Sequence, residues 1–375
     1  MDNAKTYNRI KLTVSLTETF LTVVLLVILI TTPLGRIVQD FAFIISGSDY
    51  IAFLIFIGIL GLASGILFFP LTYYTDFHLE HKYSLSNQTF WKWIWEDLKG
   101  LFVSLALGIP LLLLFFYLIK SYPESWWFIL ATVLFLFSVV LARLAPTLIF
   151  PIFYKFTPLE DEELKLKIGK LCESANLSFS GIFNFDLSKN TKKANAGFTG
   201  IRKSKRIILS DTLLSGFLHE EILSVFAHEL GHYKRRHILK NIFIGLIFSY
   251  VGLFLAAELY NFLIPAFGFS FQHQLAALPL LTLVLMLYGI VTMPIQNIIS
   301  RKFEYEADEF ALRSTKNREA FISTMEKLAK TNLADKTPHR IVEFLFYSHP
   351  SIEKRIKAAK SHEFDQRNNY AAQTV

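Results

Sequence analysis

The sequence has little charge and almost no cysteine. Charged residues make up 18% of its 375 residues, whereas a soluble domain usually carries about a quarter. Hydrophobic residues make up 53% and lie in blocks, which excludes an ordinary soluble protein. The single cysteine, Cys172, excludes an intrachain disulfide and a zinc site built from several thiolates.

The basic balance of the chain does not indicate nucleic acid. The formal net charge is +7, and the Lys and Arg residues lie mainly between the apolar blocks. No basic–aromatic recognition motif is present. Lys and Arg in such positions are typical of segments that flank membrane spans, so we expect the lipid bilayer as a partner and no nucleic acid.

Six stretches are long and apolar enough to cross a bilayer, which takes about twenty residues. All five tryptophans lie beside the starts of the third and fourth stretches, where interfacial aromatic residues are expected. The six stretches are approximately 12–32, 50–70, 100–119, 126–150, 241–266 and 276–298.

The loops predict the orientation of these spans. The N-terminus is basic, and so is the segment 151–240; four spans separate the two. The connection 267–275 has no Lys or Arg, as expected on the opposite side. The positive-inside rule therefore places both termini and the hydrophilic part in the cytoplasm. The basic set within 151–240 includes Lys192, Lys193, Arg202, Lys203, Lys205 and Arg206.

These patterns predict a mainly α, polytopic membrane protein with a small α+β domain. The expected divisions are a membrane domain at 1–150 with four spans and a cytoplasmic loop at 71–97, a hydrophilic domain at 151–360 interrupted by a membrane hairpin at 241–298, and a polar, disordered tail at 361–375. Residues 206–210 read as a short strand, 195–200 as a strand or turn before it, and 217–236 as a helix.

That helix carries a candidate metal motif, His-Glu-Leu-Gly-His. His228 and His232 are four residues apart, so on a helix they lie on one face and reach one tetrahedral zinc ion. Glu229 then suits the role of general base toward a water molecule whose acidity the metal has raised. Two surface histidines at this spacing are the alternative explanation.

A catalytic zinc site needs a third protein ligand. Four carboxylates follow the sixth span, namely Glu304, Glu306, Asp308 and Glu309. On a helix Glu304 and Asp308 share a face, whereas Glu306 points away and Glu309 lies at its margin. We assign Glu304 as the ligand and Asp308 as a carboxylate that orients a ligand imidazole; a solvated acidic helix end is the alternative.

Two other classes of zinc protease are excluded. The extended motif with a glycine and a third histidine fails, because Arg235 and Ile238 occupy those positions. An intramembrane protease with an Asp-Gly ligand pair fails as well, because the chain contains no Asp-Gly.

Several segments together resemble the CAAX prenyl protease family of membrane zinc endopeptidases. They match in order and spacing over about 70–360, and the chain resembles a bacterial member because it lacks the extra N-terminal span and longer loops of eukaryotic ones. The segments are 80–89, 151–159, 206–214, 228–237, 300–308 and 348–350.

The resemblance implies roles for further residues. It implies one zinc ion per chain, with Glu304 as the third ligand, near the cytoplasmic end of a helix-walled chamber. It implies that Asn195 and Ala196 lie on an edge strand that pairs with the substrate backbone. It also implies that His349 stabilises the oxyanion and that Arg355 supports the site or binds the substrate carboxylate.

The sequence therefore predicts a zinc metalloendopeptidase of the bacterial inner membrane, acting on peptides or proteins that include CAAX-like, prenylated or membrane-associated substrates. Gly197 departs from the aromatic residue of better-known members, which makes the substrate preference a weaker expectation than proteolysis. The alternatives are a heat-shock-type membrane quality-control protease, and a scaffold or transporter that retains a zinc site.

Overall fold

The computed structural model describes residues 3–199 and 206–363. Gly200, Arg202, Lys203, Lys205 and most of the tail, for which the sequence predicts a turn, a basic segment and disorder, lie outside the described residues. The chain forms two compact units. The hydrophilic unit consists of residues 1–5, 146–240 and 294–375, and the helical unit of residues 6–145 and 241–293.

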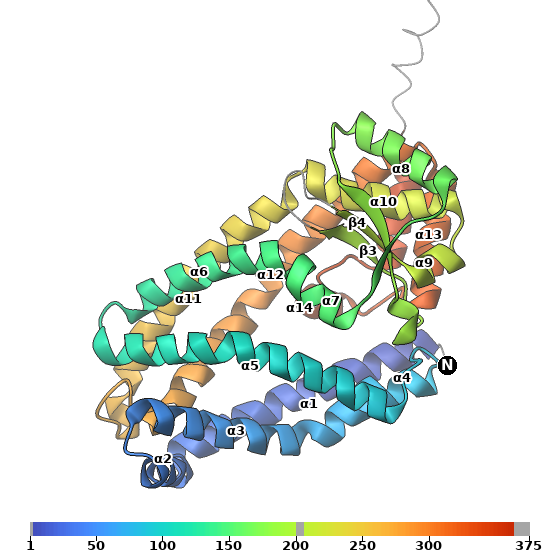
Figure 1. Cartoon of the computed structure of the whole chain (residues 1–375). Coiled ribbons are helices and arrows are strands. Elements are labelled where there is room, and N and C mark those ends of the chain that lie inside the picture. Colours follow the sequence, from blue (N-terminus) through green and yellow to red (C-terminus); the bar gives the residue numbers. More distant parts are fainter. Residues whose placement is uncertain (1–2, 200–205, 364–375) are drawn as a thin grey trace, which may run out of the picture. The chain divides into compact units, whose positions relative to one another are not determined.

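Among the described residues, six helices are long and apolar enough to cross a membrane, as the sequence predicts. They are the longest elements in Figure 1. A separate 12-residue helix, α2, follows the first of them. The helices before the sheet are α1 (Asn3–Thr31), α2 (Leu34–Ile45), α3 (Asp49–Thr72), α4 (Leu79–Lys82), α5 (Phe90–Ser121), α6 (Trp126–Leu144) and α7 (Phe150–Phe153).

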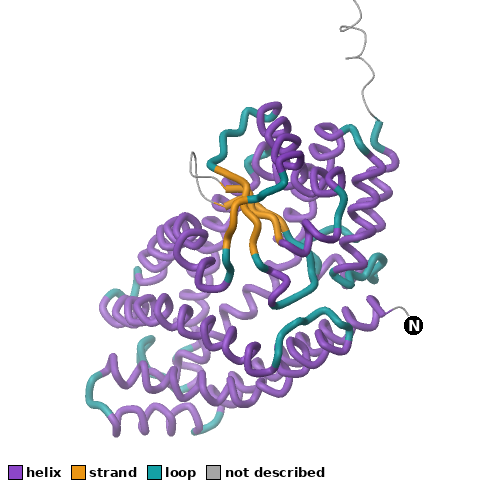
Figure 2. The backbone as a smooth tube through the Cα atoms, turned by 45° about the vertical axis from the view of Figure 1, so that its right-hand side comes forward, coloured by secondary structure: helices purple, strands orange, loops and turns teal. Residues whose placement is uncertain are grey.

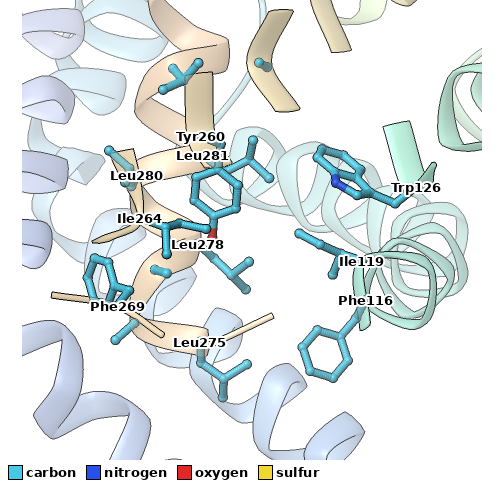
Figure 3. Packing of buried hydrophobic residues seen from close by; sticks show 14 of the residues in the cluster. Phe116, Ile119, Trp126, Tyr260, Ile264, Phe269, Leu275, Leu278, Leu280 and Leu281 are labelled. Carbon is cyan, nitrogen blue, oxygen red and sulfur yellow. The ribbon is translucent and has the colours of Figure 1, made fainter. Parts of the chain in front are cut away.

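The helical unit has a core of large apolar side chains. Tyr260 of α11 (His237–Leu263) and Leu281 of α12 (Leu278–Thr315) are buried with Phe116 and Ile119 of α5 and Trp126 of α6. Figure 3 shows these residues in one cluster. Their burial joins segments that lie far apart in the chain, so the hairpin at 241–298 packs with the N-terminal spans.

The segment 71–97 is largely helical. After α3 the chain continues through a π-helical turn, Tyr73–His78, into α4, and α5 begins at Phe90. A threonine side chain caps α5, because the Thr89 hydroxyl oxygen accepts a hydrogen bond from the Lys92 backbone N–H. The non-helical connection is therefore confined to residues 83–89.

The hydrophilic unit contains one small mixed sheet, gathered in the upper part of Figure 2. Its strands are β1 (Phe156–Pro158), β2 (Gly181–Phe185), β3 (Ala196–Thr199) and β4 (Arg206–Ser210), in the order β1-β2-β4-β3. β2 pairs in parallel with β4, β1 pairs antiparallel with β2, and β3 pairs antiparallel with β4. The strand expected at 206–210 is confirmed, and β3 forms an edge of the sheet.

Helices pack against this sheet and against one another. α10 lies beside β3, α8 and α13, and α13 lies beside α15. Ile207 and Leu209 of β4 are buried with Ile222 and Phe226 of α10. The helices of this unit, besides the end of α12, are α8 (Glu162–Ser174), α9 (Asp211–Gly216), α10 (His219–Lys234), α13 (Arg318–Thr331), α14 (Arg340–Phe346) and α15 (Ile352–Ser361).

Candidate metal centre

The helix that carries the histidine motif is held firmly in place. At its start the buried Glu221 carboxylate accepts a hydrogen bond from the Leu218 backbone N–H at 2.8 Å and pairs with Lys327 at 2.6 Å. Further along, Phe226 and Leu230 are buried in the core. Anchoring one face of α10 fixes the direction in which its histidines point.

His228, His232 and Glu304 converge on one point. The Nε2 atoms of the two histidines lie 3.1 Å apart. One Glu304 oxygen lies 3.4 Å from Nε2 of His228, and the other lies 3.3 Å from Nε2 of His232. Zinc–nitrogen and zinc–oxygen bonds of about 2.0–2.2 Å place the ligand atoms of a tetrahedral site about 3.3–3.5 Å apart. The two nitrogens lie slightly closer than this, and each lies at about this distance from a different Glu304 oxygen, so the three side chains are close enough to hold one metal ion together.

The environment of Glu304 also fits a cation. The residue is 5% exposed, and its Oε2 atom is buried without a hydrogen-bond partner among the described residues. A buried carboxylate oxygen without a hydrogen-bond partner is costly; the Arg355 guanidinium lies 3.8 Å from this oxygen, beyond hydrogen-bond distance, so a metal ion would supply the missing contact. The donor set of two imidazoles and one carboxylate leaves a fourth position open, as in catalytic zinc sites.

The other carboxylates that follow the sixth span have different partners. Glu306 lies 2.9 Å from His237 and 3.5 Å from Lys240. Glu309 pairs with Arg235 and Arg313 at the surface. Of these four carboxylates, Glu304 alone lies close enough to His228 and His232 to hold a metal ion together with them, among the residues that the structure describes.

Asp308 lies behind the first histidine ligand. Its Oδ1 atom is 2.8 Å from Nδ1 of His228, so a His228 imidazole that binds a metal through Nε2 donates its Nδ1 proton to this carboxylate. Arg355 donates to Asp308 from Nε at 2.8 Å and from a terminal nitrogen at 2.5 Å. Arg355 is 8% exposed. This geometry favours support of the site over binding of a substrate carboxylate.

A glycine allows α10 and α12 to approach closely at the site. A Cβ atom added at Gly231 would lie 2.9 Å from Cα and 3.0 Å from the carbonyl oxygen of Ala307. Ala307 is fully buried on α12, between the candidate ligand Glu304 and Asp308. The contact is with backbone, which cannot swing aside, so Gly231 sets the distance between the histidine helix and the carboxylate helix.

We expect Gly231→Ala to weaken zinc binding and to lower the free energy of unfolding by about 1–3 kcal/mol, the usual range for overpacking. The added methyl group pushes Glu304 away from the two histidines. Gly169→Ala in α8 is the matched control, because an added Cβ there meets nothing within 4 Å. Thermal unfolding in detergent and chelator competition measure both effects; equal behaviour of the two variants would contradict the prediction.

Several groups at the centre have shifted pKa values, among them His228 and Glu229. Burial lowers the pKa of His228, but its contacts with Asp308 and Glu304 outweigh this and raise the pKa to about 9. Burial raises the pKa of the Glu229 carboxyl, against the influence of the nearby His228 and His232. A glutamate with a raised pKa suits proton transfer near neutral pH.

His349 lies on the open side of the site. Its Nε2 atom is 3.4 Å from Oε1 of Glu304, and its side chain is 62% exposed. The loop that carries it is pinned by Arg301, which donates to the Tyr347 carbonyl at 2.5 Å, and by Glu343, which accepts from the Ser351 N–H at 3.0 Å. The imidazole is thus close to the candidate metal ligand Glu304 and exposed at the surface.

Asn195 and Ala196 lie at the edge of the sheet. Ala196 begins β3, whose partner on one side is β4. The Asn195 backbone is already paired with Ser210, because the Ser210 N–H donates to its carbonyl at 3.0 Å and its own N–H donates to the Ser210 hydroxyl. The other side of β3 has no strand partner within the described part of the sheet.

Sequence reasoning missed the partner of the second histidine ligand. The Nδ1 atom of His232 lies 2.9 Å from Nδ1 of His237, whose Nε2 atom lies 2.9 Å from Glu306. The helical projection of the sequence placed Glu306 away from the face that Glu304 and Asp308 share, but it did not pair Glu306 with His237. A helical projection misses this pair, because α10 ends at Lys234 and Arg236 adopts a positive φ of 57°. The signal in the sequence that could have indicated this contact is a further histidine, His237, five residues after His232.

Comparison with known families matches nearly all of the chain. Residues 158–363 match the model of peptidase family M48. Residues 1–155 match the model described as CAAX prenyl protease N-terminal, five membrane helices. In this part of the chain four helices are long enough to span a membrane, and the 12-residue α2 is a further helix.

Individual relatives agree with these models. The metalloprotease YhfN of Bacillus subtilis is 32% identical over 82% of this chain and 73% of its own length. CAAX prenyl protease 1 of Saccharomyces cerevisiae is 31% identical over 81% of this chain and 71% of its own length. The crystal structure of Ste24p from S. mikatae has a TM-score of 0.84 and 27% identity, covering 95% of this chain and 88% of that one. The chain therefore belongs to peptidase family M48, and within it to the CAAX prenyl protease (Ste24) family of membrane metalloproteases.

Proposed function

We propose that the chain hydrolyses internal peptide bonds at the centre formed by His228, His232 and Glu304, with one zinc ion per chain. The observation that supports this most strongly is the convergence of the three side chains: the two histidine Nε2 atoms lie 3.1 Å apart, and each lies 3.3–3.4 Å from one of the two Glu304 oxygens. A zinc ion held there would polarise the scissile carbonyl and raise the acidity of a water molecule.

The protein groups then have distinct roles in the proposed reaction. Glu229 accepts a proton from the attacking water and passes it to the leaving amine. His349 donates a hydrogen bond to the oxygen that becomes negative in the tetrahedral intermediate, because its Nε2 atom lies beside Glu304 and its ring is exposed. Asp308 and Arg355 hold His228 in the orientation that presents Nε2 to the metal.

The substrate is proposed to bind in an extended conformation along β3. Edge strands present unpaired backbone groups, so a peptide adds to them as a further strand. Ala196 begins β3, and Asn195, whose backbone is already paired with Ser210, precedes it. The substrate class is proposed to be peptides from membrane-associated proteins, including CAAX-like C-termini with or without a prenyl group. The name of the yeast relative supports the CAAX part.

The proposed location is a bacterial inner membrane, with the metal centre and both termini in the cytoplasm. The basic N-terminus and the basic segment 151–240 support this side, together with a connection at 267–275 that lacks Lys and Arg. Cysteine labelling from either side of the membrane, at residues introduced in these segments after replacement of Cys172, measures the orientation directly.

Cleavage of two peptides side by side tests the proposal. Purified protein in detergent is incubated with zinc and either an unmodified peptide pool or a farnesylated CAAX peptide. We expect cleavage of both, loss of cleavage on treatment with a zinc chelator, recovery on re-addition of zinc, and one zinc per chain by elemental analysis. Cleavage of the farnesylated peptide alone would restrict the function to CAAX processing. If neither peptide is cleaved in a zinc-dependent way, the proposed function is refuted.

A further inference from the structure

The two histidine ligands differ in what stands behind them. His228 meets the Asp308 carboxylate directly. Behind His232 lies instead the imidazole of His237, which can be neutral. The Nδ1 atoms of the two rings are 2.9 Å apart. The far side of that ring, Nε2, lies 2.9 Å from Oε2 of Glu306. His232 is therefore connected to a carboxylate through one intervening imidazole.

Only one arrangement of protons satisfies this chain of contacts when His232 binds a metal. Its Nε2 lone pair is then committed to the metal, so its Nδ1 atom carries a proton and donates. The Nδ1 atom of His237 must accept, which leaves the proton of His237 on Nε2. That proton is donated to Glu306. Every polar atom along the path then has a partner.

The local structure holds the intervening ring in one orientation. The His237 side chain is 2% exposed. Its ring is stacked on Phe303 of α12, with centroids 4.3 Å apart and an angle of 11° between the planes. The backbone also favours this position, because Arg236 with its φ of 57° separates α10 from α11 and returns the chain toward His232.

We propose that His237 and Glu306 form a positioning pair that orients the second metal ligand, His232, and thereby sets the affinity of the centre for zinc. The proposal rests on the proposed zinc site and adds the residues that hold its second histidine. Lys240, 3.5 Å from Glu306 and 5.1 Å from the centre of the Phe303 ring, completes the outer end of the path. Neither His237 nor Glu306 touches the point where the three ligand atoms converge.

The test compares zinc affinity by chelator competition, and the visible spectrum of the cobalt-substituted protein, in purified full-length variants. We expect His237→Phe, which keeps the stacking on Phe303 but removes both hydrogen bonds, to weaken zinc binding about 10–100-fold and to change the cobalt spectrum. His237→Asn keeps an acceptor near the Nδ1 position and should recover most of the affinity. A merely structural role for the ring predicts the reverse order.

Arg235→Ala is the matched control, because Arg235 lies at the same helix end but pairs only loosely with Glu309, at 3.8 Å. It should bind zinc as the unaltered protein does. Zinc affinity of His237→Phe within twofold of the unaltered protein, with the same cobalt spectrum, would overturn the proposal.

A second variant decides the question if His237→Phe does not fold. Glu306 is partly exposed, so Glu306→Ala perturbs the core less, and we expect it to weaken zinc binding about tenfold. Unchanged affinity in Glu306→Ala would overturn the proposal by itself. Failure of the unaltered protein to bind zinc would instead refute the proposed function, so the two outcomes are distinguishable.

Discussion

Glu229→Gln is expected to retain zinc and lose peptide cleavage by about 10²–10⁴-fold, the contribution typical of a general base. Gln has nearly the same shape as Glu but cannot accept a proton from water. The three ligand side chains do not change, so the affinity for zinc should stay the same. Peptide cleavage assays and zinc content per chain, measured on the same preparation, check both parts.

The contrast between activity and zinc content makes this experiment informative. Glu304→Gln is the companion variant, because it weakens the ligand set itself and should lose zinc and activity together. Full activity in Glu229→Gln would disprove the proposed proton transfer. Loss of zinc in that variant would move Glu229 from catalysis to metal binding.

Arg355→Leu is expected to destabilise the protein by about 3–5 kcal/mol, the cost of leaving a buried charge unpaired. Arg355 and Asp308 are 8% and 4% exposed, and the guanidinium donates two hydrogen bonds to the carboxylate. The Asp308 carboxylate would lose this partner and shift, and the imidazole of His228, its other contact, would shift with it. We therefore also expect weaker zinc binding.

Two controls separate charge, geometry and surface effects at this position. Arg355→Lys keeps the positive charge but cannot make the two-pronged contact, so its loss should be intermediate. Arg313→Leu removes a surface partner of Glu309 and should change stability by less than about 1 kcal/mol. Denaturant unfolding in detergent measures all three. A loss below 1 kcal/mol in Arg355→Leu would show that the buried pair is dispensable.

The sequence predicted the spans well and the segments between them less well. A bilayer demands about twenty apolar residues per helix, so composition alone reveals the crossing segments. Nothing comparable marks where a helix stops once it leaves the apolar stretch. Within the segment 71–97, which was expected to connect two spans on the cytoplasmic side, the helices therefore extend beyond the apolar stretches, to Lys82 and again from Phe90.

The candidate site, too, was predicted only in part from the sequence. The positions of His228 and His232 on one helix face follow from helical geometry, and so does the shared face of Glu304 and Asp308. The choice of Glu304 over its neighbours rested on helix geometry and resemblance, and the distances to both histidines now support it. Arg355 was assigned to the substrate or to the site, and its burial beside Asp308 favours the site.

The sequence by itself determined that this is a membrane protein with a histidine–glutamate metal motif, because hydropathy and helical spacing are local properties. Only the tertiary structure decided how closely α10 and α12 approach, through Gly231 against Ala307, and that His237 stands behind His232. The first depends on packing between distant segments and the second on a positive φ at Arg236. Neither leaves a periodic pattern in the sequence, since both arise where helices meet or end.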